Sequence, residues 1–343
     1  MYNFMPDLTT AAGWMPVVFL LVMGLAMLAY VVLDGYDLGV GALFLMAQDE
    51  EKDLMIASIG PFWDANETWL VLGVGILLTV FPLAHGVILG ALYLPVALML
   101  VGLTARGVAF EFRVKARPEH KQLWNFAFFW GSLVAGWAQG FMLGSLITGF
   151  RDDWGSNLFS VLIGVALVAG YSLLGAGWVI MKCEGPLQRK AILWGKASLG
   201  LTALGIASIS IATPLVSETI FNKWFSFPYF VLLLPIPLAS LTLLWVIRRS
   251  LDRMPHRLES NNQYGSGIPF GATVGLFFLC AYGLAYSLFP WLVVDRIHIW
   301  QGAVSEASMQ VIFVGAVLVL PLIVTYTVMT YRVFRGKAST LTY

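Results

Sequence analysis

The sequence has little charge. Only 11% of its 343 residues are Asp, Glu, Lys or Arg, against about 25% in an ordinary soluble domain. A soluble protein of this length could not cover its surface with so few charged side chains, so a soluble fold is excluded. The formal net charge is only +1, which gives no electrostatic reason to expect nucleic acid as a partner.

Residues that could hold a metal or a redox group are also scarce. The two cysteines, Cys183 and Cys280, form neither a CxxC pair nor a disulfide framework. No Walker A, dinucleotide-binding or HExxH motif is present. The four histidines lie in or near connections between apolar segments: His85, His120, His256 and His298. We therefore expect no haem, metal or other cofactor to be bound by ligands of this chain, and any redox chemistry to belong to another subunit.

Long apolar runs are what the sequence has in abundance. Hydrophobic residues make up 59% of the chain, and the mean hydropathy is +0.81. A membrane helix needs about 20 mostly apolar residues, and nine stretches qualify: 14–46, 56–82, 86–112, 122–149, 157–182, 190–213, 227–247, 268–290 and 308–332. The fold class predicted is an all-α polytopic membrane protein. Gly60-Pro61 is expected to kink or restart the second span, and residues 81–86 leave room only for a tight turn.

The basic residues predict the orientation of these spans. With nine spans, sixteen of the twenty Lys and Arg residues fall in one set of alternating connections and three in the other, while Arg106 lies inside a span. The richer set belongs to the cytoplasm under the positive-inside rule. The N-terminus is therefore expected outside and the C-terminus in the cytoplasm.

A weak repeat suggests how the spans are grouped. Gly35-Tyr36-Asp37-Leu38 and Gly170-Tyr171-Ser172-Leu173 are related by an offset of 135 residues. The repeat would make 14–149 and 157–290 two four-helix bundles and 308–332 a peripheral ninth helix, within one membrane subunit spanning 1–343. Chance similarity in so biased a composition is the alternative.

Charged residues inside the apolar segments are confined almost entirely to the first three. Charge in the bilayer core is costly unless paired or hydrated, and each acidic pair has the i,i+3 spacing of one helix face. The group consists of Asp34, Asp37, Asp64, Glu67 and Arg106. All five are expected in the cytoplasmic half of the membrane, where an excess of acid over base would raise at least one carboxyl pKa. The cluster is either a proton path open to the cytoplasm or a structural ion-pair network around Arg106.

Several motifs, in order along the chain, resemble subunit II of the cytochrome bd-type quinol oxidases. Residues 34–41 (DGYDLGVG) are similar to the first-helix signature of that family, and residues 63–70 (WDANETWL) to the second-helix motif, with Ala65 in place of the usual Gly. Residues 106–113 (RGVAFEFR) resemble the third-helix end, particularly in the cyanide-insensitive branch. Residues 174–185 and the tail 321–337, which ends in VFRGK, are similar to the fifth-helix and terminal elements. Gln301 stands where the family usually has an acid, so no role is assigned to it.

The resemblance implies a function and partners. The chain would pair with a similarly folded subunit I that carries haems b558, b595 and d and the quinol-binding loop, in the bacterial inner membrane. Small single-helix accessory subunits and a structural quinone in this subunit occur in some members. The complex would oxidise quinol, reduce dioxygen to water, take protons from the cytoplasm and so generate a proton motive force.

The resemblance also assigns roles within the charge cluster. Asp64 matches an aspartate implicated in a proton path, Asp34 and Asp37 would be supporting acids, and Glu67 and Arg106 supporting ion-pair partners. Two alternatives stay open. One is a proton-coupled secondary transporter, which the nearly charge-free later spans disfavour; the other is a scaffold that only stabilises subunit I.

Overall fold

The computed structural model describes residues 6–216 and 218–338, and these are almost entirely helical. Contacts divide the chain into two units, and α1 (Ala11–Leu43) and α4 (Pro82–Lys115) each pass from one unit to the other. The first unit comprises 6–34, 61–93 and 288–335 of the described residues; the second comprises 35–60, 94–216, 218–287 and 336–338. The division of the chain at 149 and 290 stays a prediction.

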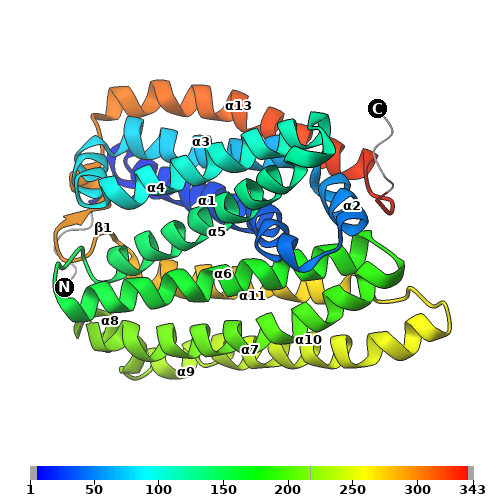
Figure 1. Ribbon diagram of the computed structural model, residues 1–343. Helices are drawn as coiled ribbons and strands as arrows, with labels where there is room; N and C mark the ends of the chain where they lie inside the picture. Colours follow the sequence, from blue (N-terminus) through cyan, green and yellow to red (C-terminus); the bar gives the residue numbers. More distant parts are fainter. Residues whose placement is uncertain (1–5, 217, 339–343) are drawn as a thin grey trace. The chain divides into compact units, whose positions relative to one another are not determined.

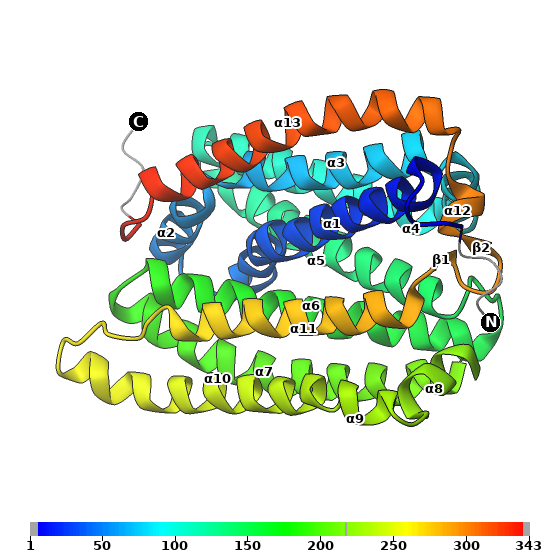
Figure 2. The same cartoon turned by 180° about the vertical axis from the view of Figure 1, so that it is seen from behind.

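The first unit contains the start of α1, α3 (Trp63–Val80), the start of α4 and α13 (Glu306–Val333). A two-stranded antiparallel hairpin, β1 (Trp291–Val293) and β2 (Ile297–His298), and the short α12 (Ile299–Gly302) precede α13. The first-unit part of α1, α3 and α13 run side by side (Figure 2). Phe313 of α13 packs edge-on against Trp14 and Phe19 of α1, which joins these two helices through aromatic contacts.

The second unit contains the remainder of α1 and α4 and the elements between them and β1. These are η1 (Phe44–Met46), α2 (Asp49–Ile59), α5 (Pro118–Ile147), α6 (Trp154–Lys182), α7 (Gly185–Val216), α8 (Glu218–Phe225), α9 (Tyr229–Leu233), α10 (Pro235–Glu259) and α11 (Ile268–Leu288). The helices α6, α7, α10 and α11 run alongside one another (Figure 1). Tyr36 of α1 stacks on Trp178 of α6 with 4.1 Å between ring centroids, so α1 is anchored in the core of this unit.

Eight helices among the described residues are long and apolar enough to cross a membrane. Their bounds agree with the expected spans to within five residues at each end, except in the seventh, where α9 and α10 continue as far as Glu259. The apolar run ends at Ile247, but the helix continues because the Arg, Leu and Met residues that follow are strong helix formers. The basic residues expected in a connection after 247 therefore lie on the helix itself.

The second expected span, 56–82, is the other departure. As predicted, the chain breaks at Gly60-Pro61: α2 ends at Ile59 and α3 begins at Trp63. The turn after α3 is equally short, since α4 begins at Pro82. The helix α3 has 18 residues, with Asp64, Asn66 and Glu67 near its start, and it is not one of the eight. The count of nine spans therefore stays a prediction.

Candidate functional site

The five charged residues singled out from the sequence lie on three helices. Asp34 and Asp37 lie on consecutive turns of α1 and Arg106 lies on α4, and all three are at most 2% exposed. Asp64, by contrast, is exposed in the first turn of α3, and Glu67 one turn further on is half-buried.

The two units divide this group. Asp34, Asp64 and Glu67 belong to the first unit, and Asp37 and Arg106 to the second. Within the first unit, α1 supplies one acid and α3 two. The meeting of all five at one site stays a prediction.

A close crossing of two helices fixes the buried part of α1 in the second unit. Gly39 lies against the backbone of Tyr171 and Gly175 of α6, and a Cβ at Gly39 would overlap the Tyr171 carbonyl oxygen. Gly35 also lies against the Tyr171 ring, so the two GY motifs of the suspected repeat are packed against each other. Small residues allow such backbone contact between membrane helices. The contact holds the turn that carries Asp37 in the core.

A second close crossing positions Arg106. Gly102 of α4 faces Gly131 and Ala135 of α5, and a Cβ at Gly131 would come within 2.8 Å of the Arg106 backbone nitrogen. The backbone of Arg106 therefore lies directly against α5. Burial of an arginine is costly without compensating contacts, and this packing gives it a fixed place within the helical core.

Asn66, which the charge-based sequence reasoning missed, is the central polar residue of the first unit. It is completely buried, its Nδ2 donates to the Leu33 carbonyl oxygen at 3.1 Å, and its Oδ1 accepts from the Tyr331 hydroxyl at 3.1 Å. One amide thereby links α3 to both α1 and α13. The only sign of this role in the sequence is the position of Asn66 near Asp64 in the motif at residues 63–70. An uncharged side chain is not found by a search for charged residues in apolar segments.

Ala65, which stands in place of the usual Gly of the motif that residues 63–70 resemble, fits within α3. Its side chain is 2% exposed within α3, whose first turns remain regular, and Thr68 donates back to the Ala65 carbonyl oxygen at 2.7 Å. The first turn of α3 is thus fixed by the buried Asn66 while Asp64 remains exposed. Acidic groups are also favoured at this end of a helix by its dipole.

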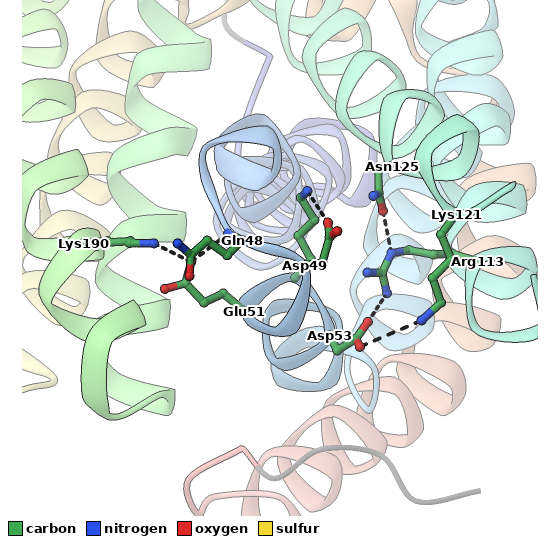
Figure 3. Close-up of polar contacts among 9 residues, drawn as sticks. Gln48, Asp49, Glu51, Asp53, Arg113, Lys121, Asn125 and Lys190 are labelled. Atoms are coloured by element: carbon green, nitrogen blue, oxygen red, sulfur yellow. Dashed lines mark hydrogen bonds and ion pairs between the residues drawn. The ribbon is translucent and has the colours of Figure 1, made fainter. Parts of the chain in front are cut away.

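Figure 3 shows a polar cluster around α2 that was not expected from the sequence. At the start of α2, Glu51 accepts from the backbone N–H of Gln48 at 2.7 Å and pairs with Lys190 of α7 at 2.8 Å. Partial burial alone would raise the pKa of Glu51, but the hydrogen bonds from Lys190 and Gln48 outweigh it and hold that pKa below its usual value. Three acids in the first turn, Asp49, Glu50 and Glu51, are typical of a helix start and could have predicted this short helix.

The opposite side of α2 is held by a buried arginine. Arg113 of α4 pairs through Nη1 with Asp53 at 2.6 Å and donates through Nε to Asn125 of α5 at 2.7 Å (Figure 3). Lys121 lies 4.0 Å from the same carboxylate, and the Arg113 guanidinium lies over the Phe44 ring. Three of the bases used above to orient the chain, Arg113, Lys121 and Lys190, therefore also dock α2 against α4, α5 and α7.

Two further motifs meet in the second unit. Lys182, at the end of α6, donates to the Gly336 carbonyl oxygen at 3.0 Å, and its own carbonyl oxygen accepts from Ala338 N–H at 2.8 Å. Lys337 lies 3.7 Å from Glu184. The fifth-helix and terminal motifs, joined here by residues 154 positions apart, thus form one clasp. Burial raises the pKa of the neighbouring Cys183 thiol to about 12, so it stays protonated and unreactive.

The side chains that could bind a metal are dispersed over the described residues. No group of three or more His, Cys, Asp or Glu in this part of the chain could hold a metal ion. His85 is half-buried in the first turns of α4, His298 is half-buried at the end of β2, and His120 and His256 are exposed. The expectation that this chain binds no haem stays a prediction.

A chain whose described residues form eight membrane-length apolar helices, with buried aspartate and arginine inside them, is a multi-pass membrane protein. More specifically, the chain belongs to the cytochrome bd terminal oxidase subunit II family, whose model matches residues 15–334. Relatives matched over much of the chain are named as subunits of cytochrome bd ubiquinol oxidases.

Individual relatives agree with this family. Subunit 2 of the cytochrome bd ubiquinol oxidase of Bacillus subtilis (strain 168) is 26% identical over 327 residues, which cover 90% of this chain and 92% of the relative. Subunit 2 of the cytochrome bd-I ubiquinol oxidase of Escherichia coli (strain K12) is 29% identical over 215 residues, covering 60% and 55%. The bd oxidase structure from Geobacillus thermodenitrificans superposes with a TM-score of 0.73 at 17% identity over 94% of this chain and 98% of that chain, so the fold is shared.

Proposed function

We propose that this chain is the haem-free subunit of a membrane quinol oxidase and that Asp64 passes protons taken from the cytoplasm toward the reaction site of its partner. The observation that carries the oxidase role is the family match over residues 15–334. The position of Asp64 supports the relay. It is exposed on this chain, where a partner subunit or water can reach it, whereas Asp34 and Asp37 are buried.

The partner in this proposal is subunit I, which would hold haems b558, b595 and d and oxidise quinol. The haems supply the electron transfer and the reduction of dioxygen to water. The residues of this chain contribute a proton path: Asp64 takes up and releases a proton at its carboxylate. Asn66 fixes the first turn of α3 through its bonds to Leu33 and Tyr331 and so keeps that carboxylate in place.

In this proposal α3 crosses the membrane as a ninth span and the C-terminus lies in the cytoplasm. The uneven distribution of Lys and Arg supports this orientation, with sixteen on the proposed inner side and three on the outer. The α2 cluster and the clasp at Lys182 would then both face the cytoplasm. Proton uptake at the inner side and none at the outer side would generate a proton motive force across the bacterial plasma membrane.

The test is the Asp64→Asn variant, expressed with its partner subunit. Loss of a proton-transfer group costs about a hundredfold in rate, so quinol-driven oxygen consumption should fall by about that factor while the haem spectrum of the complex is unchanged. Asp295→Asn is the matched control, because Asp295 is an exposed acid in the β1–β2 turn whose positive φ suits asparagine equally well. Normal turnover in Asp64→Asn would contradict the proposed relay and indicate that this chain only stabilises subunit I.

A further inference from the structure

A groove in the first unit is lined by none of the five charged residues discussed above. It has a volume of about 370 Å³ and lies between Leu33, near the end of the first-unit part of α1, and the last turns of α13. Six residues line it: Leu33, Thr327, Val328, Tyr331, Arg332 and Arg335. No acidic residue is among them, and its wall is apolar apart from the two arginines and the polar atoms of Thr327 and Tyr331.

The floor of the groove is held in place by packing and hydrogen bonds. The Tyr331 hydroxyl donates to Asn66, which in turn donates to the Leu33 carbonyl oxygen, so the two sides of the groove are connected through α3. Phe62 packs on the Tyr331 ring with 4.7 Å between centroids. The groove is therefore formed before any ligand enters it, which lowers the entropic cost of binding.

The two arginines at its end are available for a ligand. Arg332 and Arg335 are exposed, and neither forms an ion pair or a hydrogen bond with any residue in the described ranges. Arg113 and Arg248, in the second unit, are by contrast paired with aspartates. Because α13 is a membrane-length helix, its last turn lies at a membrane–water boundary, where a guanidinium can reach phosphate groups while its stem covers apolar surface.

We infer that this groove binds an anionic glycerophospholipid. The apolar wall formed by Leu33, Val328 and the ring of Tyr331 takes one acyl chain. Arg332 and Arg335 hold the phosphodiester by charge-assisted, bidentate hydrogen bonds. Two positive charges with no acid beside them favour an anionic headgroup, such as that of phosphatidylglycerol, over a zwitterionic one.

The test compares two double variants of the full-length protein, purified in detergent together with the subunits it retains. Arg332→Gln/Arg335→Gln removes the headgroup contacts. Arg189→Gln/Arg253→Gln is the matched control, because these exposed arginines also lack ion pairs within the described ranges and lie away from the groove. Each protein is incubated with phosphatidylglycerol or phosphatidylcholine, and the bound lipid is measured by native mass spectrometry.

We expect phosphatidylglycerol binding to weaken about tenfold or more in the groove variant, since each basic residue contributes appreciably to binding of anionic lipid. The control variant should bind as the wild type does. Val328→Trp supplies a second arm, because it fills the groove and leaves both arginines intact, and it should also reduce lipid binding. Equal phosphatidylglycerol binding in the groove and control variants would overturn the inference. So would loss of a retained subunit from the groove variant without loss of lipid, since a protein partner would then be the occupant.

Discussion

At the scale of single residues, Asn66 links the motif that carries the proposed relay to the structure around it. Its amide reaches Leu33, 33 positions back along the chain, and Tyr331, 265 positions ahead. Such contacts depend on the folded arrangement of three helices, and no local pattern in the sequence encodes them. The charged residues beside it could be found from the sequence because charge is rare in membrane helices.

We expect Asn66→Ala to destabilise the protein by about 1–3 kcal/mol, because it removes both hydrogen bonds and leaves buried polar groups on Leu33 and Tyr331 to be satisfied otherwise. Thermal unfolding of the purified protein in detergent measures the effect. Asn157→Ala is the control, since Asn157 makes an exposed bond to Asp152. Equal melting temperatures for the two variants would contradict the structural role of Asn66.

The crossing of α1 and α6 gives a second prediction at this scale. In Gly39→Ala the new Cβ meets the Tyr171 carbonyl oxygen, whereas in Gly24→Ala, on the same helix, it meets no atom within 4 Å. Overpacking costs about 1–3 kcal/mol, so Gly39→Ala should lower the unfolding temperature and Gly24→Ala should not. Unfolding temperatures of both variants equal to that of the wild type would contradict the close contact between α1 and α6 at Gly39.

At the scale of elements, apolar runs located the membrane helices well but not all of their ends. The helix α10 continues to Glu259 because the residues that follow its apolar part are mostly polar but are still strong helix formers. The short α2 was missed because its mean composition is polar, and it is held by ion pairs to α4, α5 and α7. The hairpin β1–β2 was not expected either, since its strands have only three and two residues.

The attachment of α2 should depend on pH. The pKa of Glu51 is lowered by Lys190 and the Gln48 amide, and that of Asp49 by Lys52. A carboxylate whose pKa is lowered in the folded state contributes stability that is complete above its unfolded pKa, near 4.5 for Glu51, and is lost as the pH falls through the lowered value. The wild type should therefore lose stability on acidification below pH 4.5.

Glu51→Gln should lower the unfolding temperature near neutral pH and flatten this acid dependence, as measured by thermal unfolding across the same pH range. Glu50→Gln is the matched control, because Glu50 is exposed on the same turn and makes no polar contact with the described residues. An acid dependence in Glu51→Gln as steep as in the control would show that the Glu51–Lys190 pair does not hold α2.

At the scale of the whole molecule, the sequence was enough to predict a multi-pass helical membrane protein and its family. Both rest on features spread along the chain: the apolar runs, and motifs from residue 34 to 337. The site was predicted less completely. Asp34, Asp37 and Arg106 are buried, whereas Asp64 is exposed because of the rotation of α3 about its axis, which Asn66 fixes and which the sequence does not encode locally.

The most direct test of the proposed function is to express the chain alone and together with subunit I, and to record a reduced-minus-oxidised spectrum of each purified preparation. We predict no haem bands from the solitary chain, and haem bands together with quinol-driven oxygen consumption from the pair. Haem bands from the solitary chain, or a pair in which this chain is dispensable for oxygen consumption, would contradict the proposal.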